Sequence, residues 1–274
     1  MHGPRLATAL TWLTLAVAGT ACASPGGEGS DTSDDESGTG DTQDTGPGVD
    51  LGMEPDMGVD PLVELEASLE AQRVAAEIPG LAACIVKHGE IAWCRGFGWA
   101  DVEARRPMDE HTVFLVASLS KPVTATAVMQ LWEDDLFELG DDVDAVAGFD
   151  IANPYFPDAP ITYLQLLTHS STVLDNYQDT PLAWDIFGED SAVSLEDLVV
   201  LYFSVTGNWY FEDNFAMAVP GAVWNYTNMG MTLVAFLAQR LTGQPYADYV
   251  EESLFEPLGM AETSWCSPTS TRTS

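Results

Sequence analysis

Basic side chains are scarce in this sequence of 274 residues. It has 9 lysines and arginines against 43 aspartates and glutamates, which gives a formal net charge of −34 at neutral pH. Lys87 and Lys121 are its only lysines. So acidic a chain repels the phosphate backbone of DNA and RNA, because nucleic-acid binding depends on clustered positive charge. We therefore expect no nucleic-acid partner.

Histidine is also rare, with four residues in the whole chain. The four histidines do not form the spacing that is typical of ligands in a metal site. Three acidic residues close together, Asp141, Asp142 and Asp144, follow a predicted helix and are interpreted as turn residues. The sequence thus predicts no metal site, and nothing in it calls for another cofactor.

Of the four cysteines, Cys84 and Cys94 flank a predicted hairpin turn at residues 87–90. With a three-residue loop centred on Gly89, the two side chains face each other across the hairpin. With a two-residue loop at His88 and Gly89, they point to opposite faces. A disulfide between them is one interpretation in an oxidising compartment. Two small apolar residues packed in a sheet are the other.

Apolar runs long enough to cross a membrane are lacking. Residues 7–18 are apolar, follow Arg5 and precede the small residues at 19–23, which is the pattern of an export signal rather than of a membrane span. Either an ordinary cleavage site ends at Ala23, or Cys22 resembles the lipid-modified cysteine of bacterial lipoproteins. We favour Cys22 as a lipid attachment site, because a tether follows directly. Residues 1–23 are therefore predicted to export the protein to the bacterial cell envelope, where it is lipid-anchored, periplasmic or secreted.

Residues 24–61 have almost nothing to bury. Residues 25–60 carry 11 acidic side chains and no lysine or arginine, and most of the rest are Gly, Ser, Thr and Pro. Such a segment cannot form a core and repels itself, so we predict a disordered acidic tether. The folded domain is then residues 62–274.

Apolar spacing and turn residues predict the elements of this domain. They are a helix over 62–76, a hairpin of 81–86 and 91–94 extended by 96–102, a helix from about Ser118 to Gly140, and helices over 161–169, from Ser194, over 229–243 and over 246–255.

The hydroxyl of Ser118 precedes the amine of Lys121 by three residues, where an apolar helical pattern begins. Residues at this spacing share one face of a helix, and here they lie at its positive end. A serine needs a base to take its proton before it can attack a carbonyl at neutral pH, and Lys121 is within reach. We therefore interpret Ser118 as a nucleophile.

Further motifs accompany this pair along the chain. They are Pro79-Gly80, residues 96–101, residues 166–170, Pro220-Gly221, Tyr226 to Asn228 and residues 256–260. With Ser-x-x-Lys at the start of a helix, the chain resembles the serine β-lactamase and penicillin-binding-protein superfamily. It is most similar to the branch of class C β-lactamases, DD-carboxypeptidases and esterases, over roughly residues 62–265.

This resemblance implies an α+β fold of the β-lactamase/transpeptidase type, with an antiparallel sheet flanked by helices and a mostly helical lobe. It also implies that Ser118 is acylated by a small-molecule or peptidoglycan-type substrate, which is a β-lactam, a stem peptide or a simple ester. Lys121 would be its base or tune that base, and Tyr226 would be the second base and proton shuttle. Asn228 would hydrogen-bond the substrate amide and the lysine. The N–H of Ser118 can supply one oxyanion donor.

Two departures from the family pattern stand out. No Lys-Thr-Gly or His-x-Gly follows Asn228, since the last lysine is Lys121 and the last histidine is His169. We therefore expect a C-terminally truncated domain that lacks its last strands and has little or no activity. The alternative to an enzyme is a catalytically dead, envelope-tethered fragment or binding module. The second departure is Thr172, near which the family usually has glycine; His169 itself is interpreted as structural.

Overall fold

The computed structural model describes residues 60–178, 191 and 193–265. The predicted signal segment, all but the end of the tether, Cys22 and Cys266 lie outside the described residues. The chain divides into two compact units, Met1–Thr112 and Val113–Ser274, each with its own internal packing. None of the helices in the described part of the chain is long and apolar enough to cross a membrane.

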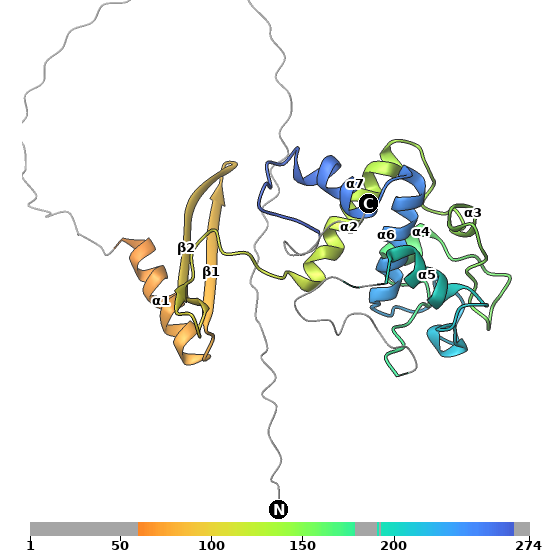
Figure 1. The fold of residues 1–274 in the computed structure, drawn as a ribbon, viewed down its shortest axis with the longest axis horizontal. Coiled ribbons are helices and arrows are strands. Elements are labelled where there is room, and N and C mark those ends of the chain that lie inside the picture. Colours follow the sequence, from red (N-terminus) through yellow and green to blue (C-terminus); the bar gives the residue numbers. More distant parts are fainter. Residues whose placement is uncertain (1–59, 179–190, 192, 266–274) are drawn as a thin grey trace, which may run out of the picture. The chain divides into compact units, whose positions relative to one another are not determined.

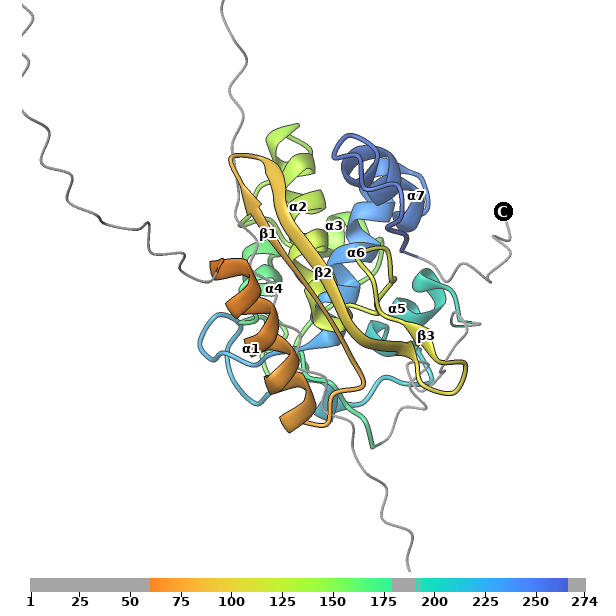
Figure 2. The same ribbon diagram turned by 90° about the vertical axis from the view of Figure 1, so that its left-hand side faces the viewer.

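The first unit is a small antiparallel sheet with one helix along it (Figures 1 and 2). Its elements are α1 (Pro61–Ala75), β1 (Gly80–Lys87), β2 (Glu90–Asp101) and β3 (Arg106–Pro107), with the strand order β1-β2-β3. The helix begins at Pro61, one residue before the predicted start, because the Asp60 carboxylate accepts a hydrogen bond from the Leu62 N–H and Pro61 stands at the first position. The Trp93 indole of β2 donates to Glu66 of α1 at 2.9 Å.

The hairpin between β1 and β2 has the two-residue loop. Lys87 pairs with Glu90, and His88 and Gly89 between them have φ values of 54° and 79°. Two left-handed residues in a row form the tight turn whose twist matches that of the flanking strands. On its own, this loop would place the two cysteines on opposite faces of the sheet.

A β-bulge next to this turn reverses that outcome. Val86 pairs with Ile91, but Ile85 pairs with Trp93, so β2 has one extra residue at this point. The extra residue shifts the register by one, and Cys84 then lies opposite Cys94, with the two sulfurs joined in a disulfide. The sequence contained both loop alternatives but did not indicate the bulge.

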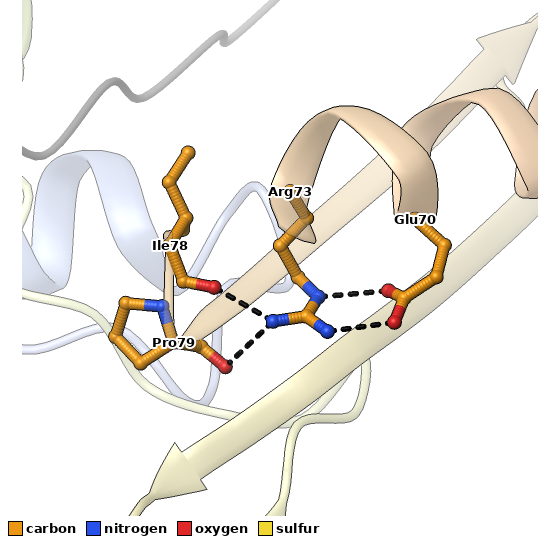
Figure 3. Close-up of polar contacts among 4 residues, drawn as sticks. All are labelled: Glu70, Arg73, Ile78 and Pro79. Atoms are coloured by element: carbon orange, nitrogen blue, oxygen red, sulfur yellow. Dashed lines mark hydrogen bonds and ion pairs between the residues drawn. The ribbon is translucent and has the colours of Figure 1, made fainter. Parts of the chain in front are cut away.

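Arg73 closes the end of α1 against the start of β1 (Figure 3). Its guanidinium makes two hydrogen bonds to Glu70, at 2.7 and 2.6 Å, and donates to the carbonyl oxygens of Ile78 and Pro79. The planar, five-donor group suits this bidentate arrangement. A Cβ at Gly98, where φ is 74°, would collide with the Pro79 carbonyl and the Arg73 side chain, so this position requires glycine.

The second unit is helical. Its elements are a 3₁₀ turn at Ala117–Leu119, α2 (Ser120–Glu133), α3 (Asp144–Ala147), α4 (Tyr163–Leu167), α5 (Leu195–Phe203), a 3₁₀ turn at Glu212–Asn214, α6 (Asn228–Thr242), α7 (Tyr246–Val250) and a π-helical turn at Glu251–Phe255. Among its described residues, extended pairing is limited to isolated bridges, Asp142 with Thr162 and Val173 with Phe215.

Helix α6 is the centre of this unit, and Figure 1 shows it among the other helices. It contacts α2, α3, α4, α5 and α7, and its residues from Met229 to Ala238 are buried except Thr232. A helix that is apolar on nearly every side belongs in the interior. It ends as predicted at Gly243, which takes the left-handed conformation at φ 71°.

The prediction that the Ser118 helix extends to Gly140 was wrong. Helix α2 ends at Glu133, and Asp135 takes the left-handed conformation at φ 57°. The N–H groups of Asp135 and Leu136 then bond back to the carbonyls of Trp132 and Leu131, the two hydrogen bonds of a Schellman motif. Aspartate here takes the place that glycine usually fills, so the stop signal was missed.

Candidate active site

Ser118 and Lys121 lie where the 3₁₀ turn passes into α2. The Lys121 Nζ is 3.2 Å from the Ser118 Oγ, as residues one helical turn apart can be. Ala117, directly before the serine, has a φ of 46°. This left-handed conformation costs an alanine roughly 1–2 kcal/mol, and such strain is typical of functional sites.

Tyr226 and Asn228 reach the same point from the start of α6. The Tyr226 hydroxyl lies 2.7 Å from the Ser118 Oγ. Lys121 donates to the Asn228 Oδ1 at 2.6 Å, and its Nζ lies 4.7 Å from the centre of the Tyr226 ring. The structure thus brings together all four predicted site residues, from segments more than one hundred residues apart in the sequence.

The position of these two side chains follows from how α6 begins. Thr227 is the extended N-cap residue, and its Oγ1 accepts a hydrogen bond from the Gly230 N–H at 3.1 Å. Asn228 is therefore the first helical residue, and Tyr226 lies just outside the helix. A Cβ at Gly230 would approach the Thr227 methyl to 2.7 Å, so glycine leaves room for the cap.

Asp175, which lies in a loop distant in the sequence, also accepts hydrogen bonds at the N-terminus of α6. Its Oδ1 accepts from the backbone N–H groups of Asn228 and Met229 and from the Thr227 hydroxyl, each at 2.9 Å. An anionic acceptor at a helix N-terminus is favourable, because the first N–H groups have no partner within the helix. Asp175 was not predicted, because no sequence spacing relates it to α6.

Tyr177 was missed as well. Its hydroxyl donates to the Asp175 Oδ2 at 3.0 Å and accepts from the Asn228 Nδ2 at 2.9 Å. Burial raises the pKa of the Tyr177 phenol, and the charge of Asp175 and the hydrogen bond to it act in the same direction. The phenol therefore stays protonated and remains a donor.

His169 contacts both the Tyr226 ring and the backbone at the start of α6. Its ring centre lies 4.7 Å from that of Tyr226, and its Nδ1 accepts a hydrogen bond from the Thr227 N–H at 3.4 Å. Burial lowers the pKa of the His169 imidazole, the nearby charge of Lys121 lowers it further, and Asp175 acts in the opposite direction. A neutral imidazole is the form that can accept this hydrogen bond. These contacts agree with a structural histidine.

The loop after His169 takes a conformation that usually calls for glycine. Thr172 has a φ of 69° although it is β-branched and buried. The Asn153 Nδ2 holds it, donating to the Thr172 Oγ1 at 2.9 Å and to the carbonyls of Ala216 and Ala218. Thr172 therefore takes a left-handed conformation without being glycine, and the Asn153 side chain contacts its hydroxyl.

The electrostatics of the site centre on Tyr226. Burial by itself raises the pKa of the Tyr226 phenol. Hydrogen bonds with Lys121 and Ser118 and the positive charge of Lys121 outweigh this effect and hold the pKa below its usual value, against a small opposing influence of Asp175. A phenol with a lowered pKa is better suited to accept the proton of the serine.

A cavity of ≈ 370 Å³ opens beside Lys121 and Asn228. Its walls are mostly apolar and include Leu195, Met231, Ala235, Pro245 and Trp265. Among the described residues, no group of three or more His, Cys, Asp or Glu could hold a metal ion. The site thus offers a serine, a lysine, a tyrosine and an amide, with apolar space next to them.

Comparison with known proteins decides the family. The family model described as Beta-lactamase matches residues 66–273, well over half of the chain. The chain belongs to the beta-lactamase family. The resemblance inferred from the motifs is confirmed.

This beta-lactamase-family chain is similar to relatives of different kinds. It is 33% identical to Penicillin-binding protein 4* of Bacillus subtilis over 178 residues, which cover 64% of this chain and 35% of that protein. It is 30% identical to Esterase EstB of Burkholderia gladioli over 210 residues, which cover 74% of this chain and 51% of that protein. The chain thus spans about half, or less, of the length of these relatives.

Among solved structures, it is similar to the octameric penicillin-binding protein homologue from Pyrococcus abyssi. The TM-score is 0.62 at 27% identity, covering 74% of this chain and 44% of the other. The predicted α+β fold of the β-lactamase/transpeptidase type is therefore confirmed for this beta-lactamase-family chain.

Proposed function

We propose that this chain belongs to a serine hydrolase that cleaves an amide or ester through an acyl-enzyme on Ser118. One observation carries the proposal. The Ser118 Oγ lies within hydrogen-bond distance of both the Lys121 Nζ, at 3.2 Å, and the Tyr226 hydroxyl, at 2.7 Å. A serine between two groups that can move a proton is the arrangement that nucleophilic catalysis requires.

The proton path follows from the tyrosine's lowered pKa. As the Ser118 Oγ attacks the substrate carbonyl carbon, its proton passes to the Tyr226 oxygen, which Lys121 stabilises in its ionised form. The tetrahedral intermediate collapses when its C–N or C–O bond breaks, and Tyr226 gives the proton to the leaving amine or alcohol. Water then attacks the acyl ester and gives a proton to Tyr226. The bond between the acyl carbon and the Ser118 oxygen breaks, the acid is released, and Tyr226 passes the proton from water to Ser118.

Asn228 keeps the lysine in place for this chemistry. Its Oδ1 accepts from Lys121 at 2.6 Å, so the amine stays between the serine and the tyrosine ring. The amide nitrogen has two hydrogens, one of which is used by Tyr177. The second hydrogen is suited to a substrate carbonyl, which is the substrate-binding role predicted for this residue.

Relatives named as a penicillin-binding protein and as an esterase support substrates with a carbonyl that a serine can attack. The three candidates are a β-lactam, a peptidoglycan stem peptide and a simple ester. The apolar walls of the neighbouring cavity favour an apolar group on the substrate.

Reaction with a fluorophosphonate tests this proposal. We expect one probe molecule to attach per chain, because the serine oxygen displaces fluoride from phosphorus. The rate should rise with pH as Tyr226 loses its proton and level off above a midpoint below about 10, the usual pKa of tyrosine. Stopped-time labelling read by intact mass, at pH values across this range, measures both quantities.

Tyr226→Phe is the matched variant for this experiment. It should label about 10²–10⁴-fold more slowly and lose the rise with pH, since general-base catalysis contributes about that factor. A pH profile unchanged by Tyr226→Phe would refute the proton path. A folded chain that takes up no probe would favour the inactive fragment or binding module instead.

We also propose that the protein is exported and held at the cell envelope, with Cys22 as its lipid attachment site and residues 24–61 as the tether. The support is the apolar run at 7–18 followed by small residues and an acidic, low-complexity segment. Cells fed a clickable fatty acid should yield a labelled protein, and Cys22→Ala should remove the label. An unlabelled protein with its N-terminus at Ser24 would indicate ordinary cleavage after Ala23.

A further inference from the structure

We propose that Asp175 and Tyr177 are positioning residues that set which end of the Asn228 amide faces Lys121. This inference rests on the proposed function. It concerns a chain of hydrogen bonds that runs from Asp175 through Tyr177 and Asn228 to Lys121 and ends at Ser118. Each link in this chain fixes the direction of the next.

The two ends of an asparagine amide have nearly the same size but opposite hydrogen-bonding character. The oxygen only accepts, and the nitrogen only donates. The Lys121 Nζ donates to the Asn228 Oδ1 at 2.6 Å, which requires the oxygen end to face the lysine. Because Asn228 is at the first turn of α6, its side chain can rotate between the two orientations unless its other end is held.

Tyr177 holds the other end. A hydroxyl has one hydrogen, and Tyr177 gives it to the Asp175 Oδ2 at 3.0 Å. Asp175 accepts only, so the direction of this bond is fixed. The Tyr177 oxygen is then left as an acceptor for the Asn228 Nδ2 at 2.9 Å. The amide oxygen at this position would face a second acceptor with no hydrogen between them, so the amide nitrogen is directed to Tyr177 and the oxygen to Lys121.

Asp175 is itself immobilised by α6. Its Oδ1 accepts from the Asn228 and Met229 N–H groups and the Thr227 hydroxyl, so the carboxylate cannot turn away from the helix. The same residue therefore caps the helix that carries Asn228 and, through Tyr177, orients the Asn228 side chain. A capping role alone would not involve Tyr177.

The capping of α6 and the orientation of the Asn228 amide can be separated experimentally, because Tyr177 is 56% exposed. Removing its hydroxyl leaves the cap and the core of the unit intact. It allows the amide to turn its nitrogen toward Lys121, where two donors would face each other. The lysine would then lose its acceptor and move away from Ser118, while the fold would persist.

The first experiment compares rates of fluorophosphonate labelling in the full 274-residue chain. Tyr177→Phe is expected to label about 10- to 100-fold more slowly with an unchanged melting temperature, in line with the effect of displacing a catalytic group by about an ångström. Tyr155→Phe, a tyrosine of the same unit outside the site, should label as the unaltered chain does. Equal rates for Tyr177→Phe and the unaltered chain would overturn the proposal.

The second experiment is a double-mutant cycle with Asn228→Asp. A carboxylate has two acceptor ends, so it needs no orientation. Tyr177→Phe should therefore change the labelling rate by less than about twofold in the Asn228→Asp background, since the coupling is lost with the amide. A slowing of the same size in both backgrounds would show that Tyr177 acts by another route. The labelling rates of slow variants can be measured by using an excess of the probe and following the reaction for hours.

Failure of this inference is distinguishable from failure of the proposed function. If Ser118→Ala is labelled at the rate of the unaltered chain, the nucleophile is wrong and with it the purpose of the hydrogen-bond chain. If labelling depends on Ser118 but not on Tyr177, only the positioning role is overturned.

Discussion

Replacing Ser118 with alanine is expected to abolish covalent labelling by a fluorophosphonate or a fluorescent penicillin. The adduct forms through the serine oxygen, and alanine has no atom that can take its place. The rest of the site does not depend on this hydroxyl for its structure, since Lys121 is also held by Asn228 and the Tyr226 ring. The melting temperature should therefore change little. Gel fluorescence and intact mass measure the loss.

Ser120→Ala is the matched control for this variant. Ser120 is two residues further on, at the start of α2, and is not among the residues that contact the Ser118 hydroxyl. It should be labelled at nearly the rate of the unaltered chain. Labelling lost equally in both variants would point to a disturbed helix start rather than to a missing nucleophile. Labelling retained in Ser118→Ala would remove the basis of the proposed function.

The second large effect is expected for Lys121→Met. Methionine has a similar length and is apolar, so it fills the space while removing the amine. The site then loses the group that donates to Ser118 and to Asn228 and whose charge lies near the Tyr226 ring. We expect labelling to slow by about 10²–10⁴-fold, the contribution of a general acid or base. Rates measured with excess probe provide the comparison.

The pH profile of Lys121→Met sharpens this test. The pKa of Tyr226 is held down by hydrogen bonds with Lys121 and Ser118 and by the lysine's charge. Removing Lys121 should therefore move the midpoint of the labelling rate to higher pH. Lys87→Met, which replaces the only other lysine, at the end of β1, is the control and should leave the rate and the midpoint unchanged. A normal rate in Lys121→Met would contradict the assigned role.

The part of the site that could be predicted is the part that depends on local geometry or on the family pattern. Ser118 and Lys121 are one helical turn apart, and this spacing alone places the hydroxyl near the amine. Tyr226 and Asn228 could be named only through the resemblance, because nothing in composition or spacing links them to Ser118. The structure brings all four together across the contact of α2 with α6.

What could not be predicted depends on tertiary contacts. Asp175 and Tyr177 meet Asn228 only because a distant loop folds against the start of α6, and a carboxylate in a loop has many other uses. Asp135 and Thr172 take left-handed conformations that sequence patterns assign to glycine. A single bulge decided the pairing of Cys84 with Cys94, and its position was not visible in the sequence.

Locating the adduct by tandem mass spectrometry identifies the side chain that acts as the nucleophile. The 274-residue chain is reacted with a fluorophosphonate near the plateau of its pH profile, digested, and searched for the modified peptide. We expect one modified residue, Ser118, on the peptide that precedes α2, and no adduct on Ser120 or Tyr226. An adduct on another side chain, with Ser118 unmodified, would contradict this expectation.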